Sequence, residues 1–269
     1  MDVLCPQAQR TMMRWIRLLL IRLFQLAANL LKGLFYVHFK LFPQQRFRIP
    51  RYAKPIIRAK GASLIPRAVW QTNYTDSVTF PVYFNYLWNR LMAPTCEHHY
   101  WVDDDLLQFI ETNFSTETSD TFKKLQIGAA QADFWRALVL WKYGGVYLDV
   151  DAALCWPVVW SLENERRELF LKGKDGHVTN FFLAAQPEHP VFWKIAMQIQ
   201  KNIQENKIAS LYDMTGPTVV VNIVSNEDVR IERSNLVCKQ GIFVKKVFQY
   251  PDQMKNYWVM EQQNRSITK

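Results

Sequence analysis

Residues 130–154 of this 269-residue chain read AQADFWRALVLWKYGGVYLDVDAAL, and this segment indicates the fold class. Residues 121–143 predict one long helix. Gly144-Gly145 then supply the residue type that tolerates the left-handed backbone with which helices commonly end. A strand, VYLDVDAAL, follows at once. A helix that passes directly into an apolar strand is typical of α/β architectures.

The residues before this segment alternate in the same way. We expect strands at 64–72 and 98–102, a helix at 81–91, and another helix that starts at Asp103-Asp104-Asp105. This order predicts an α/β sandwich with a mainly parallel sheet, in which ligands bind beyond the carboxyl ends of the strands. The three consecutive aspartates invite interpretation as a metal site, but Asp is favoured at helix caps and in the first turn, so we interpret them as capping residues.

The sequence VYLDVD predicts a metal site. Strand alternation would put Tyr147, Asp149 and Asp151 on one face. Two carboxylates so close together repel each other and are costly to desolvate unless something neutralises them. A divalent cation supplies that compensation, and oxygen ligands favour Mn²⁺ or Mg²⁺ over zinc.

A second pair of charged residues precedes the strand. Asp133 and Arg136 are three apart on the predicted helix, so they share a face and can form an ion pair. Such a pair offers an acceptor and a fork of donors to sugar hydroxyls. An ordinary intrahelical salt bridge is the alternative interpretation.

The charge of the chain is unevenly distributed. The first 60 residues hold 12 of the 33 Lys and Arg residues but one of the 24 acidic residues, a net of +11, whereas the remainder carries a net of −2. The excess positive charge is therefore not spread over a fold, which excludes a general nucleic-acid binder. The four cysteines are isolated in the sequence, which indicates ordinary thiols rather than a disulfide framework or a zinc site.

Residues 10–40 predict a basic amphipathic helix. Its polar stripe consists of Arg10, Arg14, Arg17, Arg22, Gln25, Asn29, Lys32, Tyr36 and Lys40. A wide apolar face beside a cationic stripe favours a helix that lies on an anionic membrane surface. A membrane-spanning anchor and a helix packed on the body are the alternatives. We thus expect two units: a membrane-associating helix and connector at 1–60, and a globular domain at 61–269.

The core sequence resembles a known family. The string at 130–154 looks like the signature of the sugar-binding-region glycosyltransferases with a DXD motif, family 32. That family includes yeast-type α-1,6-mannosyltransferases, and its core is similar to that of the large clostridial toxin glucosyltransferases. The resemblance extends to IPRAVWQT at 65–72, NFFLAAQPEHPVFW at 180–193 and TGP at 215–217, so it covers roughly residues 64–220.

This resemblance implies a GT-A-type (Rossmann-like) fold and an enzyme that transfers a hexose from a UDP- or GDP-sugar with retention of configuration, using Mn²⁺ or Mg²⁺. Carried over by position, Asp149 and Asp151 would bind the metal and diphosphate. The resemblance assigns the donor to Trp70 and Gln71, with Trp70 stacking near the base, and to Asp133, Arg136, Tyr147 and Asn180. A glycan or glycolipid near a membrane is the expected acceptor.

Two other functions fit parts of the sequence. Haloacid-dehalogenase phosphatases also begin with a strand that ends in Asp-x-Asp, but they expect Thr or Val where this chain has Ala153. A carbohydrate-binding subunit without turnover is the non-enzymatic alternative. The basic stripe favours the cytoplasmic face of a bacterial inner membrane, and a type II protein of the Golgi membrane is the alternative location.

Overall fold

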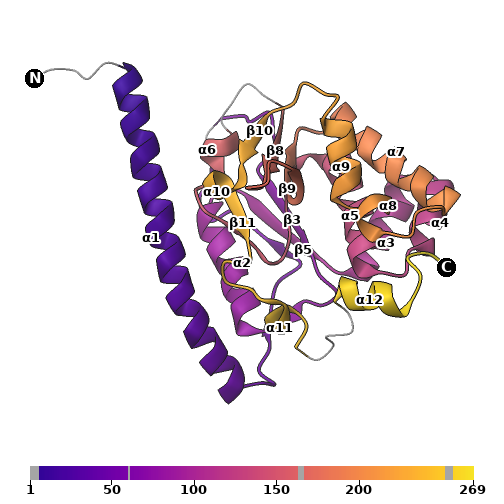
Figure 1. Ribbon diagram of the computed structural model, residues 1–269, viewed down its shortest axis with the longest axis horizontal. Coiled ribbons are helices and arrows are strands. Elements are labelled where there is room, and N and C mark those ends of the chain that lie inside the picture. Colours follow the sequence, from indigo (N-terminus) through magenta and orange to yellow (C-terminus); the bar gives the residue numbers. More distant parts are fainter. Residues whose placement is uncertain (1–5, 60, 163–166, 252–256) are drawn as a thin grey trace, which may run out of the picture.

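The computed structural model describes residues 6–59, 61–162, 167–251 and 257–269. Its centre is a seven-stranded sheet with the order β10-β8-β9-β6-β3-β5-β2 (Figure 1). The strands are β2 (Tyr52–Ala53), β3 (Ala68–Thr72), β5 (Glu97–Trp101), β6 (Gly145–Leu148), β8 (Glu168–Lys172), β9 (Val178–Ala185) and β10 (Ile231–Arg233). Two short pairs lie outside the sheet: β1 (Phe47–Arg48) with β4 (Ser77–Val78), and β7 (Ala152–Leu154) with β11 (Cys238–Gln240).

Helices cover both faces of the sheet, so the predicted α/β sandwich is confirmed. The helices are α1 (Pro6–Leu41), α2 (Phe80–Met92), α3 (Asp103–Asn113), α4 (Thr116–Lys124), α5 (Gly128–Tyr143), α6 (Val159–Leu162), α7 (Pro190–Glu205), α8 (Leu211–Met214), α9 (Pro217–Val224), α10 (Ser234–Val237), α11 (Lys246–Gln249) and α12 (Trp258–Asn264). Strand alternation divides β6 between two cores. Tyr147 packs with the cluster under α5 and α7, while Val146 and Leu148 pack in the cluster on the opposite face.

The expectation of a mainly parallel sheet is wrong. β10 with β8, β6 with β3 and β3 with β5 pair in parallel, but β8 with β9, β9 with β6 and β2 with β5 pair antiparallel. The chain returns from β8 to β9 through a short connection that no helix occupies, and a short return of this kind makes an antiparallel pair. The sheet is therefore mixed.

Local sequence explains the other boundaries. The predicted helix 121–143 is two helices, α4 and α5, because the chain between them turns aside at Leu125, which bridges to Thr268. α5 ends at Gly144, whose φ is 64° and whose missing Cβ would lie 2.7 Å from the Ala185 carbonyl oxygen. The Asp103-Asp104-Asp105 run begins α3, where Asp105 accepts a hydrogen bond from the Val102 N–H at 2.8 Å. The capping interpretation is thus confirmed.

The described cysteines are buried free thiols, as expected: Cys96, Cys155 and Cys238. Cys5 lies outside the described residues.

The N-terminal helix α1 docks along the body beside α2 (Figure 1). Ile21, Ala28 and Phe35 are buried at seven-residue intervals. Phe24 stacks on Trp88 with ring centroids 4.6 Å apart, and Phe35 contacts Phe243. The packed arrangement, which was one of the alternatives, is therefore present over the described side chains. Arg10 and Arg14 of the predicted stripe lie outside them.

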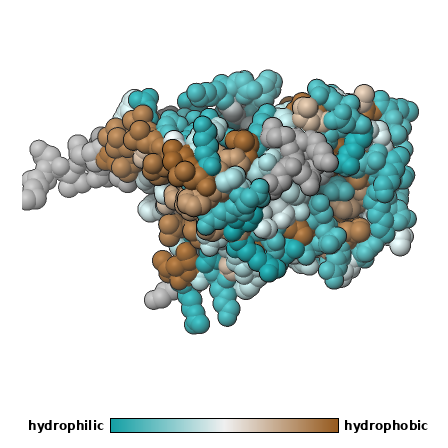
Figure 2. All heavy atoms as spheres, turned by 90° about the horizontal axis from the view of Figure 1, so that it is seen from below, coloured by the Kyte–Doolittle hydropathy of each residue, from teal (hydrophilic) through white to brown (hydrophobic). Residues whose placement is uncertain are grey.

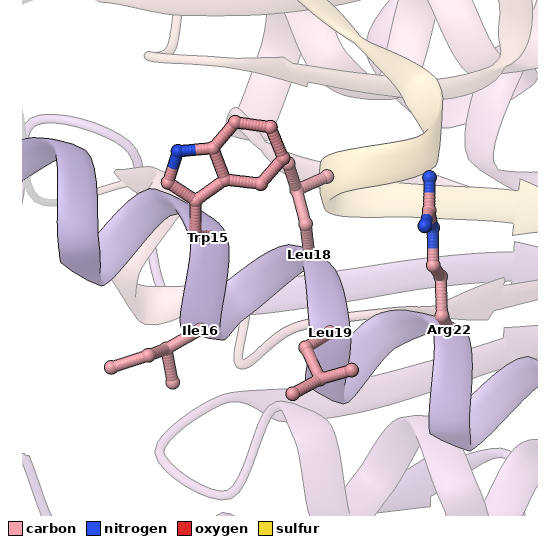
Figure 3. A pocket seen from close by; sticks show the side chains of 5 residues that line it. All are labelled: Trp15, Ile16, Leu18, Leu19 and Arg22. Atoms are coloured by element: carbon pink, nitrogen blue, oxygen red, sulfur yellow. The ribbon is translucent and has the colours of Figure 1, made fainter.

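The side of α1 that faces away from the body is also apolar. It exposes Trp15, Ile16, Leu19, Leu20, Leu23, Leu26, Leu30, Leu34, Val37 and Leu41. Figure 2 shows hydrophobic side chains gathered at the end of the molecule where α1 lies. Figure 3 shows the first turns of the described helix, where Trp15, Ile16, Leu18, Leu19 and Arg22 line a pocket. Within the described chain, Trp15–Leu41 is the one stretch long and apolar enough to cross a membrane, judged by length and composition.

Because His98 on β5 is buried, we expect the free energy of unfolding to depend on pH. His98 is 2% exposed, and burial, with a smaller effect from Arg90, lowers the pKa of its imidazole to about 3. Between pH 3 and 6.5 the unfolded chain binds a proton at this residue that the folded chain does not, so stability falls as the pH falls below 6.5. At pH 5 this loss should be about 2 kcal/mol.

The comparison of wild type with His98→Leu isolates this contribution, because the other titrating groups are common to both. Urea denaturation at pH 5 and pH 7 should show a smaller loss of unfolding free energy in the variant. Equal losses in the two proteins would mean that His98 is protonated in the folded state as readily as in the unfolded state.

Candidate active site

The candidate site lies beyond the carboxyl end of β6. The strand ends at Leu148, and Asp149-Val150-Asp151 form a turn in which the Ala152 N–H donates to the Asp149 carbonyl at 2.9 Å. The prediction that Asp149 and Asp151 share a strand face by alternation is therefore wrong in its geometry. The turn brings the two carboxylates together instead, so that one amide nitrogen, that of Gln240, reaches both.

The two carboxylate oxygens of Asp149 face different partners. Its Oδ1 accepts a hydrogen bond from the Tyr147 hydroxyl at 2.7 Å and lies 3.2 Å from Nη1 of Arg136. Its Oδ2 accepts from the Gln240 amide at 2.9 Å, and the same amide nitrogen lies 3.2 Å from Oδ1 of Asp151. Asp149 thus links a buried basic group on one side to a cluster of oxygen atoms on the other.

Arg136 on α5 contacts several groups in the buried part of the site. Its guanidinium lies 3.0 Å from Oδ1 of Asp133 and 4.3 Å from the ring centroid of Tyr147, and it donates to the Asn180 carbonyl at 2.6 Å. Burial works against its charge, but the acidic groups around it outweigh burial and raise its pKa above the ordinary value. Arg136 is therefore a permanent cation between Asp133 and Asp149.

Asp133 is enclosed by donors from three separate parts of the chain. Besides Arg136, it accepts from the Asn180 amide of β9 at 2.8 Å and from the Thr215 hydroxyl at 3.0 Å. The side chain is buried, and burial raises the pKa of Asp133 to about 7 against the attraction of Arg136. The carboxylate and the guanidinium are each held in place by several partners, and their predicted role toward sugar hydroxyls stays a prediction.

The donor set beyond Asp149 fits a hard divalent cation. When ionised, Asp133, Asp149 and Asp151 carry three negative charges, and Arg136 is the one cation within ion-pair distance of them in the described parts of the chain. Burial and repulsion from Asp149 raise the pKa of Asp151 to about 7. A divalent ion at the two carboxylates of the turn would balance this charge, and both offer the oxygen ligands that Mn²⁺ and Mg²⁺ prefer.

Comparison with known proteins concerns the same part of the chain. Residues 81–168, which include β5, α5 and the Asp149-Val150-Asp151 turn, match the family described as "Glycosyltransferase sugar-binding region containing DXD motif". The chain carries this sugar-binding region. Asp149-Val150-Asp151 is the Asp-x-Asp sequence within the matched range, so the predicted resemblance to this family is confirmed.

The related proteins are much longer than the matched segment. The initiation-specific alpha-1,6-mannosyltransferase of Saccharomyces cerevisiae is 30% identical over 38% of this chain and 23% of its own length. The enzyme of the same name from Schizosaccharomyces pombe is 22% identical over 58% of this chain and 46% of its own. The chain thus spans less than half of either relative. A solved structure, PaToxG glycosyltransferase, superposes with a TM-score of 0.48 and 12% identity, covering 77% of this chain and 80% of its own.

The structure gathers most of the predicted donor residues around the sugar-binding region. Asp133, Arg136, Tyr147, Asn180 and Asp149 form one hydrogen-bonded network. Gln71 is buried beside it, with its amide 3.5 Å from the Asp149 carbonyl. Their roles toward a donor sugar stay predictions.

Trp70 lies outside this network. The side chain is 4% exposed, its indole N–H donates to the Gly144 carbonyl at 2.8 Å, and its ring stacks on His99 with centroids 4.1 Å apart. These contacts enclose the ring near the amino end of β6, away from the Asp149 turn. The structure therefore favours a packing role over the expected stacking on a nucleotide base.

Sequence reasoning missed Thr215 and Gln240 as site residues. Thr215 stands in the TGP sequence that contributes to the family resemblance, so that motif was the available signal. Gln240 has no local motif. It reaches the turn because β11 pairs with β7, which joins residues 89 positions apart in the chain.

Proposed function

We propose that this chain is a metal-dependent retaining glycosyltransferase that moves a hexose from a nucleotide sugar to a membrane-proximal glycan or lipid-linked acceptor. The observation that carries the proposal is the continuous network from Asp133 through Arg136 and Asp149 to Asp151, within a sugar-binding region with a DXD motif. The names of the relatives make a mannosyl donor the first to test.

Each part of the network would have a separate task. Asp149 and Asp151 would hold Mn²⁺ or Mg²⁺. When bound, such an ion stabilises the negative charge that develops on a departing diphosphate. Asp133 and Arg136 would bind and orient the hydroxyls of the donor hexose, and Asn180 and Thr215 fix the Asp133 carboxylate for that purpose. Tyr147 fixes Asp149 through its hydroxyl.

The direct test measures nucleotide release from a panel of UDP- and GDP-sugars, with GDP-mannose first, in the presence of Mn²⁺. We expect metal-dependent release from one donor. Binding of a nucleotide sugar without release, in the presence of candidate acceptors, would instead favour a carbohydrate-binding subunit that lacks turnover.

The outer face of α1 supports the membrane part of the proposal. The docked face buries Phe35 and Ile21 against the body, so α1 would have to expose them in order to leave the body and span a bilayer. The apolar outer face can enter the headgroup region without such a change, with Arg22 and Lys40 exposed beside it. We therefore propose that α1 lies in the plane of an anionic membrane surface, as at the cytoplasmic leaflet of a bacterial inner membrane.

Substitutions on the two faces of α1 separate membrane binding from folding. Leu19→Ser/Leu23→Ser/Leu26→Ser should weaken binding to phosphatidylglycerol-containing vesicles at least about tenfold, since burial of each leucine contributes about 1.5–3 kcal/mol. The melting temperature should stay within about 2 °C, because these side chains are exposed in the free protein.

The matched control is Phe35→Ala on the docked face. It should cost about 3–5 kcal/mol of stability and leave vesicle binding of the folded protein unchanged. Co-sedimentation and thermal denaturation measure the two effects. Undiminished vesicle binding by the triple variant would contradict the proposed orientation.

A further inference from the structure

The two carboxylates of the Asp149-Val150-Asp151 turn, called the DXD turn below, both contact one neutral side chain, that of Gln240. The Gln240 amide nitrogen donates to Oδ2 of Asp149 at 2.9 Å and to Oδ1 of Asp151 at 3.2 Å. A single atom that reaches both carboxylates stands between them, which is where an ion shared by the two must also bind. The side chain of Gln240 therefore has direct access to the expected cation position.

The backbone fixes Gln240 beside the turn. β11 pairs antiparallel with β7, with Gln240 opposite Ala152. The next residue, Gly241, donates its N–H to the Asp151 carbonyl at 3.0 Å, and its φ of 68° lets the chain turn away at once. Backbone hydrogen bonds thus join β11 to β7 and to the Asp151 carbonyl at the end of the turn, and they hold the Gln240 backbone beside the carboxylates.

The residues that follow Gln240 anchor it to the rest of the molecule. Ile242, Phe243, Val244 and Phe248 are buried in one cluster with the docked face of α1. Phe243 contacts both Phe24 and Phe35 of that helix. The segment 238–248 is thus held by β7 at one end and by α1 at the other. The movement of Gln240 that this leaves is rotation about its own side-chain bonds.

A primary amide can bind both the metal-free carboxylates and a bound cation. It carries a two-proton donor and an oxygen acceptor on one planar group, and half a turn about its last bond exchanges them. Rotation about the earlier side-chain bonds withdraws the group, so that an ion can enter between the carboxylates. With the nitrogen inward, the amide donates to both carboxylates, as the structure shows. With the oxygen inward, it adds a neutral third oxygen to two carboxylates, a donor set suited to Mn²⁺ or Mg²⁺.

We propose that Gln240 is a ligand of the divalent cation, and that its amide presents nitrogen to the carboxylates of the metal-free site and oxygen to the bound ion. This inference rests on the proposed metal-dependent function. It assigns to β11 a residue that neither the DXD sequence nor the matched range 81–168 contains. The neutral ligand leaves the charge balance to Asp149 and Asp151, so the pair and a divalent ion cancel.

Binding of Mn²⁺ to the full chain tests the assignment without measuring turnover. Free Mn²⁺ is followed by electron paramagnetic resonance, with and without GDP or UDP, in wild type, Gln240→Glu and Gln240→Leu. We expect Gln240→Leu to bind Mn²⁺ about 10–100-fold more weakly. The carboxylate of Gln240→Glu keeps an oxygen at the same reach, so this variant should bind as tightly as wild type or more tightly.

Two controls make the outcome specific. Gln204→Leu replaces an exposed glutamine on α7 and should bind Mn²⁺ like wild type. Circular dichroism shows whether each variant is folded. If Gln240→Leu does not fold, Gln240→Glu alone provides the test, and a weaker Mn²⁺ affinity of Gln240→Glu overturns the assignment.

The remaining outcomes separate the two proposals. Unchanged or tighter Mn²⁺ binding by folded Gln240→Leu would overturn the ligand role, since the amide would then only neutralise an empty pair of carboxylates, and metal-dependent transfer would stand. Absence of Mn²⁺ binding in wild type, with the same result for Asp151→Asn, would overturn both the ligand role and the metal dependence.

Discussion

Asp151→Asn is expected to reduce metal-dependent nucleotide release by at least about 10³-fold. The substitution keeps the size of the side chain but removes one of the two negative charges that the turn offers to a cation. The loss should appear in kcat, because the charge that the ion stabilises develops as the leaving group departs. Steady-state assays at saturating Mn²⁺ with the donor found in the panel measure the effect.

The control for this substitution is Asp104→Asn, which changes an exposed aspartate in the first turn of α3. It should retain the activity of wild type, because Asp104 lies at a helix end and not in the Asp149 network. A residual rate in Asp151→Asn within tenfold of wild type would contradict a direct role of the turn in metal binding. Weaker Mn²⁺ binding should accompany the loss of rate.

Arg136→Met is expected to cost about 3–5 kcal/mol of folding free energy. Arg136 is 6% exposed, and its removal leaves the buried carboxylate of Asp133 without its cation. For a chain of this size the melting temperature should fall by about 10 °C. If the proposed function holds, the folded fraction should also lose donor binding, because the guanidinium proposed to orient the donor hexose is absent.

A double-mutant cycle distinguishes the loss of the ion pair from a packing defect. Asp133→Asn/Arg136→Met should be more stable than the sum of the single substitutions predicts by about 1 kcal/mol or more, because the unpaired carboxylate is removed as well. The control is Lys201→Met, which removes an exposed ion pair with Glu205 on α7. That variant should change stability by less than about 1 kcal/mol. Additivity within error at Asp133 and Arg136 would contradict the coupling.

The docked helix α1 illustrates how far a periodic pattern can be interpreted. The amphipathic pattern of residues 10–40 correctly predicts a helix, which the structure extends over Pro6–Leu41. The pattern does not reveal that two separate sides are apolar. The side with Ile21, Ala28 and Phe35 finds an aromatic partner surface on α2 and the 242–248 segment, and that surface exists only after the body folds.

The DXD turn shows the same limit at the site. Alternation along a strand places Tyr147 correctly, because β6 is regular up to Leu148. The strand ends there because Asp149 begins a turn whose continuation, β7, pairs with β11 instead of the central sheet. A distant partner thus decides the geometry of two residues that are adjacent to a regular element.

Contacts between residues that are close in the chain follow from the sequence alone. The Asp133–Arg136 pair follows from the helical period, the end of α5 from Gly144-Gly145, and the start of α3 from the capping aspartates. The packing of distant segments brings Thr215 and Gln240 to the site and encloses Trp70. Thr215 meets Asp133 across 82 residues, and Gln240 meets Asp151 across 89. Local torsional preferences act over a few residues, whereas contacts at such separations exist only when the sheet and its helices have packed.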